Sequence, residues 1–223
     1  VGLGGTAVGT GLNAPIKYVY LVNERLRQIV GAGIARAENM IDAIQNADVF
    51  VEVSGLLKAA AVNLMKIAND LRLLSSGPKC GLKEINLPEV QPGSSIMPYK
   101  VNPVIPEVVN QVAFQVVGNN VTISMAVEAG QLELNVMEPV LAFNLFLSFD
   151  IMTNAIQVFR TKCIEGITAN EEVCRAMVER SIGVVTALNP HIGYENSCAI
   201  AKEAFKSGKS VKQVCLERGI LTE

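Results

Sequence analysis

Eleven consecutive residues, GSSIMPYKVNP at Gly93–Pro103, bring together side chains that suit a negatively charged ligand. Ser94 and Ser95 follow a glycine, so two hydroxyl groups and several closely spaced backbone N–H groups are available to surround an oxyanion. Lys100 adds a positive charge, and Asn102 adds an amide that can donate and accept hydrogen bonds. These residue types predict a site for a carboxylate substrate. An ordinary surface loop rich in Pro, Gly and Ser is an equal alternative when only the residue types are considered.

The segment after this run predicts a helix whose first turn would lie next to the ligand. Pro106 and Glu107 suit a helix start, and the apolar residues that follow extend to about Ala129. Unpaired N–H groups and the helix dipole attract anions to such a start. Charged residues occur only at Glu107 and Glu128, so this helix is predicted to be buried on all sides.

Long helices are predicted to be the elements that hold the loop. Apolar residues recur in steps of three and four between Leu57 and Leu74. The long helices are expected at 15–30, 35–74, 106–129 and 138–162. Short amphipathic helices are expected at Glu171–Glu179, Glu195–Lys206 and Val211–Arg218. We therefore predict an all-α fold with a helical-bundle domain at 1–165, which contains the loop at 93–103, and a small helical C-terminal domain at 166–223.

The overall composition narrows the class of protein. Half of the residues are hydrophobic, aromatic residues account for 5% and tryptophan is absent, which favours closely packed aliphatic helices. The mean hydropathy of +0.34 predicts apolar surface that contacts partner chains. A net charge of −2 gives no basic surface for nucleic acid.

The cysteines and the beginning of the sequence indicate the compartment. Five scattered cysteines without a CxxC pair predict neither a disulfide framework nor a zinc site, so a reducing cytosol is expected. No charged start followed by an apolar run precedes Pro15, so no signal peptide is predicted. The chain lacks an initiator Met, which we interpret as the sign of a fragment.

One apolar segment, Pro139–Phe159, is long enough to cross a bilayer and carries a single charge at Asp150. A central Asp costs about 2.5–3.5 kcal/mol on membrane-insertion scales. Polar residues such as Asn144 and Gln157 also recur along it. A helix buried among other helices is therefore the preferred interpretation.

The run Gly93–Pro103 resembles the GSSxMPxKxNP signature of the aspartase/fumarase superfamily at every fixed position. The resemblance extends over essentially the whole chain, and GGTAVGTGLN at Gly4–Asn13 resembles a segment that follows the second active-site region of these enzymes. Two stretches, Pro106–Asn119 and Glu128–Val140, are more similar to aspartases than to fumarases.

The resemblance implies a reversible anti elimination of ammonia from L-aspartate, which gives fumarate through an aci-carboxylate intermediate. Ser94 would be the general base, and the loop would have to lower the pKa of its hydroxyl with N–H groups and positive charge. Lys100 and Asn102 match positions that bind the substrate carboxylate. Glu107 matches a glutamate that pairs with an active-site histidine from another segment.

Other loop residues match positions with supporting roles in the family. Ser95 and Met97 would contribute to substrate binding, and Gly93 and Ile96 would support the loop backbone. Tyr99 departs from the Gly or Ala that the family pattern leads us to expect. Its side chain either points to solvent or alters loop closure and substrate preference.

In this superfamily three subunits of a homotetramer donate three separated regions to each active site. This chain contains only the third region, so a Thr-His pair is expected upstream and the chain alone should be inactive. The resemblance implies no required cofactor and no metal-ligating residue, and it allows a divalent cation such as magnesium as an activator. It also implies a cytoplasmic enzyme that binds L-aspartate and fumarate but neither nucleic acid nor a membrane.

Two alternatives remain at this point. A class II fumarase would hydrate fumarate to malate, whereas a non-catalytic helical assembly module would keep the fold without the chemistry. The intact loop argues against the module. A hydrolase built on His191, the single histidine, is disfavoured because no GxSxG elbow is present.

Overall fold

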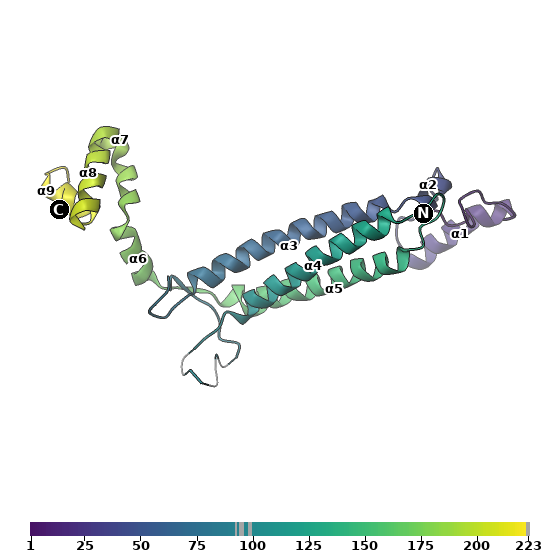
Figure 1. Cartoon of the computed structure of the whole chain (residues 1–223), viewed down its shortest axis with the longest axis horizontal. Helices are drawn as coiled ribbons and strands as arrows, with labels where there is room; N and C mark the ends of the chain where they lie inside the picture. The colour runs from purple at the N-terminus through teal and green to yellow at the C-terminus, as the bar shows by residue number, and fades with distance from the viewer. Residues whose placement is uncertain (92, 94–95, 98–99, 222–223) are drawn as a thin grey trace. The chain divides into compact units, whose positions relative to one another are not determined.

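The computed structural model describes residues 1–91, 93, 96–97 and 100–221, and its secondary structure is almost entirely helical (Figure 1). The predicted all-α class is therefore confirmed. The chain forms two compact units. The first unit combines Val1–Asp70 with Pro92–Glu165, and the second combines Leu71–Gln91 with Gly166–Glu223.

Three long helices form the body of the first unit. They are α3 (Asp48–Leu74), α4 (Val104–Glu128) and α5 (Glu138–Lys162), and they lie side by side in Figure 1. Near the α4–α5 connection, side chains of all three helices form one apolar cluster, with Val53 and Leu57 of α3 packed against Ile123 and Leu141. A second cluster farther along the helices contains Ala61, Ala113, Val116 and Met152. The steps of three and four in the sequence thus place one face of each helix in a shared core.

Buried amides also join these helices. Asn120 of α4 donates a hydrogen bond from Nδ2 to Oγ of Ser54 on α3 at 2.8 Å. Asn119 of α4 donates from Nδ2 to Oγ of Ser148 on α5 at 3.0 Å. Because both ends of each bond lie inside the bundle, a slip of one helix along another would leave these groups unpaired.

Two shorter helices complete the first unit. Helix α1 (Ile16–Val30) confirms the predicted helix at 15–30, except that Pro15 is its N-cap, and Gly31 ends it in a left-handed conformation. Asn23 of α1 holds the preceding segment by donating from Nδ2 to the Leu3 carbonyl oxygen at 2.8 Å.

The prediction of one helix over 35–74 is wrong in its first part. The structure has a separate α2 (Met40–Gln45), and α3 begins only at Asp48. The Asn39 side chain accepts hydrogen bonds from the backbone N–H groups of Ile41 and Asp42 and so fixes a new helix start. Asn46 is extended and ends α2. The Asn39 side chain caps α2 and the Asn46 backbone is extended, so neither residue continues a helix through these positions.

The helices on either side of the α4–α5 connection were predicted more closely. Helix α5 has the bounds Glu138–Lys162 that the sequence indicated. Helix α4 begins two residues before Pro106, which its first turn accepts because no N–H group is required there.

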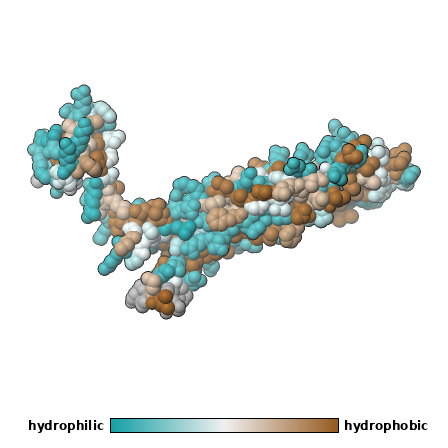
Figure 2. All heavy atoms as spheres, in the orientation of Figure 1, coloured by the Kyte–Doolittle hydropathy of each residue, from teal (hydrophilic) through white to brown (hydrophobic). Residues whose placement is uncertain are grey.

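The prediction that α4 is buried on all sides is wrong for the single chain. Its exposed apolar residues are Val108, Phe114, Val121 and Met125. Figure 2 shows hydrophobic patches along the bundle on the face in view.

One helical stretch, Glu138–Gly166, is long and apolar enough to cross a membrane by length and composition, and 33% of its most apolar window is buried. Its buried side chains include Leu141, Leu145, Met152 and Phe159, and the first three belong to the clusters shared with α3 and α4. A core helix of a water-soluble bundle passes the same test. The expected burial among other helices therefore holds for one face only.

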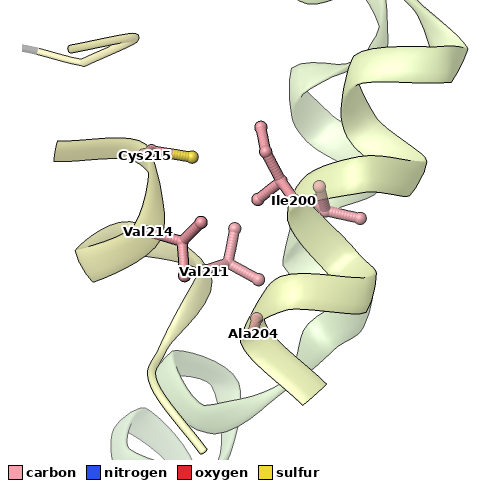
Figure 3. Packing of buried hydrophobic residues seen from close by; sticks show 6 residues of the cluster. Ile200, Ala204, Val211, Val214 and Cys215 are labelled. Carbon is pink, nitrogen blue, oxygen red and sulfur yellow. The ribbon is translucent and has the colours of Figure 1, made fainter. Parts of the chain in front are cut away.

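The second unit is built around a small helical core. Strands β1 (Ile85–Asn86) and β2 (Thr168–Ala169) pair antiparallel. The elements after β2 are α6 (Glu171–Arg180), the 3-10 helix η2 (Ile182–Leu188), α7 (Asn189–Ile192), α8 (Tyr194–Ser207) and α9 (Val211–Glu217). Figure 3 shows Ile200 and Ala204 of α8 facing Val211, Val214 and Cys215 of α9. The three predicted amphipathic helices here are confirmed to within one residue.

The two compact units differ from the predicted domains in one segment. Residues 71–91 were assigned to the domain at 1–165, but they pack with 166–223. The β1–β2 ladder is one reason, and Asn170 is another, because its Nδ2 donates to the Lys83 carbonyl oxygen at 2.7 Å. The backbone N–H of Asn170 also donates to the Glu84 carbonyl oxygen at 2.8 Å. How the domains divide in the assembled protein stays a prediction.

Candidate functional site

The two ends of the Gly93–Pro103 loop lie close together in the first unit. Asn102 donates a hydrogen bond from Nδ2 to the Gly93 carbonyl oxygen at 3.0 Å. Gly93 also lies so close to the backbone of Lys100 that a Cβ atom added at Gly93 would overlap the Lys100 carbonyl group. The glycine is therefore required by close approach of two backbone segments.

The second half of the loop is shaped by short-range backbone hydrogen bonds. The Lys100 N–H donates to the Met97 carbonyl oxygen at 3.3 Å, and the Val104 N–H donates to the Asn102 carbonyl oxygen at 2.8 Å. Lys100 and Met97 are exposed, as is Ile96. Lys100 therefore carries a positive charge at an exposed position, and a backbone hydrogen bond ties it to Met97.

Glu107 lies in the first turn of α4, directly after the loop. Its backbone N–H donates to the Pro103 carbonyl oxygen at 3.1 Å, and its side chain is half-buried. A carboxylate in the first turn is stabilised by the helix dipole. Within the described residues, Pro103 at the N-cap offers no side-chain cap, so the first turn depends on backbone groups and on Glu107.

Sequence reasoning missed a pair of amides just beyond this turn. Asn110 of α4 is buried and donates from Nδ2 to Oδ1 of Asn69 on α3 at 2.7 Å. The other end of the Asn110 amide, Oδ1, is buried and accepts no hydrogen bond in the described part of the chain. The available signal was an amide among the apolar residues of the predicted helix, although its partner is 41 residues away in the sequence.

Some predicted site residues are not part of the described structure. Ser94, Ser95 and Tyr99 lie outside the described residues, so the roles predicted for them stay predictions. Of the other predicted residues, the structure brings Gly93, Lys100 and Asn102 together, and Glu107 follows one turn later.

Away from the loop, a metal cluster and a pocket are the other kinds of candidate site. Among the described residues, no group of three or more His, Cys, Asp or Glu side chains could hold a metal ion. An open pocket of about 320 Å³ is lined by residues at the start of α3 and the end of α4, including Asn46, Asp48 and Gly130. Helix α4 has 25 residues. At about 1.5 Å per residue, its length separates this pocket from the loop.

The cysteines are free thiols. Burial raises the pKa of Cys163 and of Cys215 above the ordinary thiol value. A raised pKa lowers the thiolate fraction at neutral pH, so these two side chains suit packing better than nucleophilic chemistry.

Comparison with known proteins identifies the family of the chain. A family model described as lyase matches residues 1–118, and one described as the fumarase C C-terminus matches residues 184–223. The chain is 58% identical over 221 residues to an aspartate ammonia-lyase of Helicobacter pylori and 56% identical over 223 residues to that of Escherichia coli. These alignments cover 99% and 100% of this chain but 47% of each relative. The chain therefore spans about half the length of the curated relatives it matches.

Solved structures of lyases in the same superfamily superpose on almost the whole chain. A structure titled fumarate lyase:delta crystallin from Brucella melitensis bound to cobalt superposes with a TM-score of 0.94 at 50% identity, over 98% of this chain and 48% of that one. A class II fumarase from Schistosoma mansoni superposes with a TM-score of 0.86 at 38% identity, over 99% of this chain and 49% of that one. Because the lyase family model matches more than half of the residues, and the loop carries the superfamily signature, the chain belongs to the lyase family of the aspartase/fumarase superfamily.

Proposed function

We propose that the protein to which this chain belongs is an aspartate ammonia-lyase, which converts L-aspartate reversibly to fumarate and ammonia. The observation that carries the proposal is the 55–58% identity to aspartate ammonia-lyases along essentially the whole chain. The identity to the class II fumarase structure is lower, at 38%. Relatives of this kind act on small molecules, which suits the charged loop.

In the proposed reaction, the Ser94 alkoxide removes a proton from the carbon beside the β-carboxylate. The electron pair left behind moves into that carboxylate and gives an aci-carboxylate with an additional negative charge. Its collapse forms the carbon–carbon double bond and breaks the bond to nitrogen, so ammonia leaves and fumarate remains. The protein must therefore stabilise two anions, the serine alkoxide and the aci-carboxylate.

The described loop residues support these roles. Lys100 supplies a positive charge that favours a carboxylate, and Asn102 supplies an amide beside it. The Asn102–Gly93 hydrogen bond holds the two ends of the loop together, so a substrate carboxylate bound by Lys100 would be near the N–H groups of the loop. Glu107 would orient a histidine contributed by another segment, which matches the family pattern.

We also propose a homotetramer whose subunits share active sites. The bundle helices expose apolar side chains that a water-soluble single chain would ordinarily bury. On α5 these include Phe143, Phe146 and Phe149. Association of several copies through such faces would bring regions of other subunits to the loop.

The proposal includes no required cofactor, a divalent cation such as magnesium as an activator, and a cytoplasmic location. Chelation followed by readdition of magnesium should change the rate of the full-length enzyme without abolishing it. If chelation abolished turnover completely and magnesium restored it, the metal would be essential to the reaction and not only an activator.

The test uses the full-length protein with L-aspartate and follows the ultraviolet absorbance of fumarate. Turnover is expected with L-aspartate, and a Ser94→Ala variant should fold but lose turnover by several orders of magnitude. A Ser94→Ala variant that turns over at nearly the parental rate would remove Ser94 as the base.

A class II fumarase is the second candidate, favoured by the match of residues 184–223 to the fumarase C C-terminus. The same absorbance assay with L-malate distinguishes the two enzymes. Turnover of L-malate but not of L-aspartate would reject the aspartase proposal and keep the superfamily.

A further inference from the structure

Asn110 is a buried polar residue whose presence folding alone does not explain. Its side chain is 4% exposed, and Nδ2 donates to Oδ1 of Asn69 at 2.7 Å. Its Oδ1 is buried and accepts no hydrogen bond from the residues that the structure describes. An unpaired buried oxygen lowers stability, so such a group in a folded protein calls for a reason other than stability.

The position of Asn110 suggests that reason. It lies one helical turn after Glu107 and two turns after Pro103, which ends the signature loop. Residues three apart on a helix are neighbours on its surface, so Asn110 lies beside Glu107. Its partner Asn69 belongs to α3, so the hydrogen bond joins the first two turns of α4 to the neighbouring helix.

We propose that Asn110 is a positioning residue of the lyase site. Through Asn69 it fixes the start of α4 against α3, and thereby the placement of Lys100, Asn102 and Glu107, which precede it in the chain. This inference rests on the function proposed above. Catalytic groups must be held to within about half an ångström, and supporting hydrogen bonds on rigid elements provide that precision. A leucine at this position would fill a similar volume and leave no oxygen of its own unpaired, whereas the amide fixes the position of α4 against Asn69 of α3.

The chain contains a matched control for this interpretation. Asn120 is also buried on α4, and its Nδ2 also donates to a side chain of α3, Ser54 Oγ, at 2.8 Å. Asn120 lies ten residues after Asn110, which is about 15 Å farther along the helix from the loop. The two asparagines share their helix, their burial and a hydrogen bond to α3, but they differ in their distance from the site. They differ also in that Asn110 Oδ1 accepts no hydrogen bond among the described residues, and in that Ser54 is buried whereas Asn69 is exposed.

The experiment compares Asn110→Leu with Asn120→Leu in the full-length enzyme. Asn110→Leu should keep its thermal midpoint and oligomeric state, yet lower kcat for L-aspartate by about tenfold to a hundredfold with a smaller change in KM. Asn120→Leu should stay within about twofold of the parental kcat. Equal losses in the two variants, or a loss in Asn110→Leu that follows a lower thermal midpoint, would reduce Asn110 to a structural residue and overturn the proposal.

A double-mutant cycle tests the partner. If Asn69 and Asn110 act as one unit, Asn69→Ala combined with Asn110→Ala should lose no more activity than the poorer single variant. Losses that multiply would show that the two residues act separately and would remove Asn69 from the proposal.

Hydrogen–deuterium exchange gives a readout that does not depend on the reaction. In Asn110→Leu, amides of residues 100–108 should exchange at least severalfold faster than in the parental protein, and in Asn120→Leu they should not. Unchanged exchange in Asn110→Leu would overturn the positioning role even if the enzyme is active. Inactivity of the parental protein with L-aspartate would instead overturn the proposed function, while the exchange comparison would still decide the role of Asn110.

Discussion

At the beginning of the signature loop, the space beside Gly93 is already occupied by the Lys100 backbone. Gly93→Ala should therefore push the two ends of the loop apart and weaken the Asn102 hydrogen bond to the Gly93 carbonyl oxygen. Because Lys100 and Asn102 would move together, we expect kcat/KM of the full-length enzyme to fall by about tenfold to a hundredfold. The steady-state rate with L-aspartate measures this effect.

Gly33→Ala is the matched control for that substitution. Gly33 also lies outside a helix, and a Cβ atom added there would meet no heavy atom within 4 Å. Its kcat/KM should stay at the parental value. A Gly93→Ala enzyme as active as Gly33→Ala would show that the loop tolerates the wider separation.

The thiol of Cys163 predicts how stability depends on pH. Its side chain is buried, and burial raises the pKa of the thiol in the folded state. The folded protein then binds the thiol proton more tightly than the unfolded chain does. This contribution to stability is complete below the unfolded thiol pKa of about 8.5 and is lost as the pH rises through the folded value.

Urea unfolding of the parental protein and of Cys163→Val between pH 7.5 and pH 10 measures this contribution. The free energy of unfolding should fall less steeply with alkaline pH in Cys163→Val, because lysines and tyrosines titrate equally in both proteins. Parallel curves would show that Cys163 keeps its proton equally well in both states.

The types and order of residues in Gly93–Pro103 predicted the superfamily, and the family model and the relatives confirm it. The anion site predicted from the same residues stays a prediction, although the Asn102–Gly93 hydrogen bond brings the ends of the loop together. The Asn69–Asn110 pair could not be predicted in the same way. Its meaning depends on two helices meeting at one point, and sequence periodicity does not determine which residues face each other across that contact.

At the scale of the elements, the Ser54–Asn120 bond between α3 and α4 allows a test of buried polarity. Ser54→Ala alone removes the acceptor of the Asn120 Nδ2 group and should lower the free energy of unfolding by about 1–3 kcal/mol. Ser54→Ala combined with Asn120→Leu removes both polar groups and should recover most of that loss. Urea denaturation of the three proteins measures both effects.

The helix boundaries show where the sequence pattern is enough to predict the ends of a helix. Helix α5 was predicted correctly because Glu138 and Pro139 mark its start and no further Pro or Gly interrupts the residues up to Lys162. The break between α2 and α3 was missed because it depends on the Asn39 side chain capping the backbone and on an extended Asn46. An asparagine that can cap a helix can also lie within one, so the residue type alone does not determine where a helix begins.

At the scale of the whole molecule, residues 71–91 pack with 166–223 in the described structure, although the predicted domain at 1–165 included them. A two-residue strand such as Ile85–Asn86 has no periodicity of its own, and only its pairing with Thr168–Ala169 ties it to the second unit. Long-range pairing of short segments is therefore the part of this fold that the sequence predicts least well.

The apolar surface of the bundle leads to the last prediction, which concerns assembly. Phe143 and Phe146 lie one turn apart on the outer side of α5 and are 65% and 66% exposed. Leaving such side chains in water is unfavourable, and burial between copies would remove that cost. Phe143→Glu combined with Phe146→Glu should therefore dissociate the proposed tetramer, because every interface that contains these residues would gain buried negative charge.

Light scattering after size-exclusion chromatography of the full-length protein measures the mass of the assembly, and activity should fall together with it if subunits share sites. Phe205→Glu is the matched control, since Phe205 is also an exposed aromatic residue on a helix but belongs to the second unit. This variant should keep both the mass and the rate. A tetramer that survives the two α5 substitutions would place the contacts between subunits on other faces of α3 and α4, whereas a dissociated protein that remains active would show that one subunit builds the site alone.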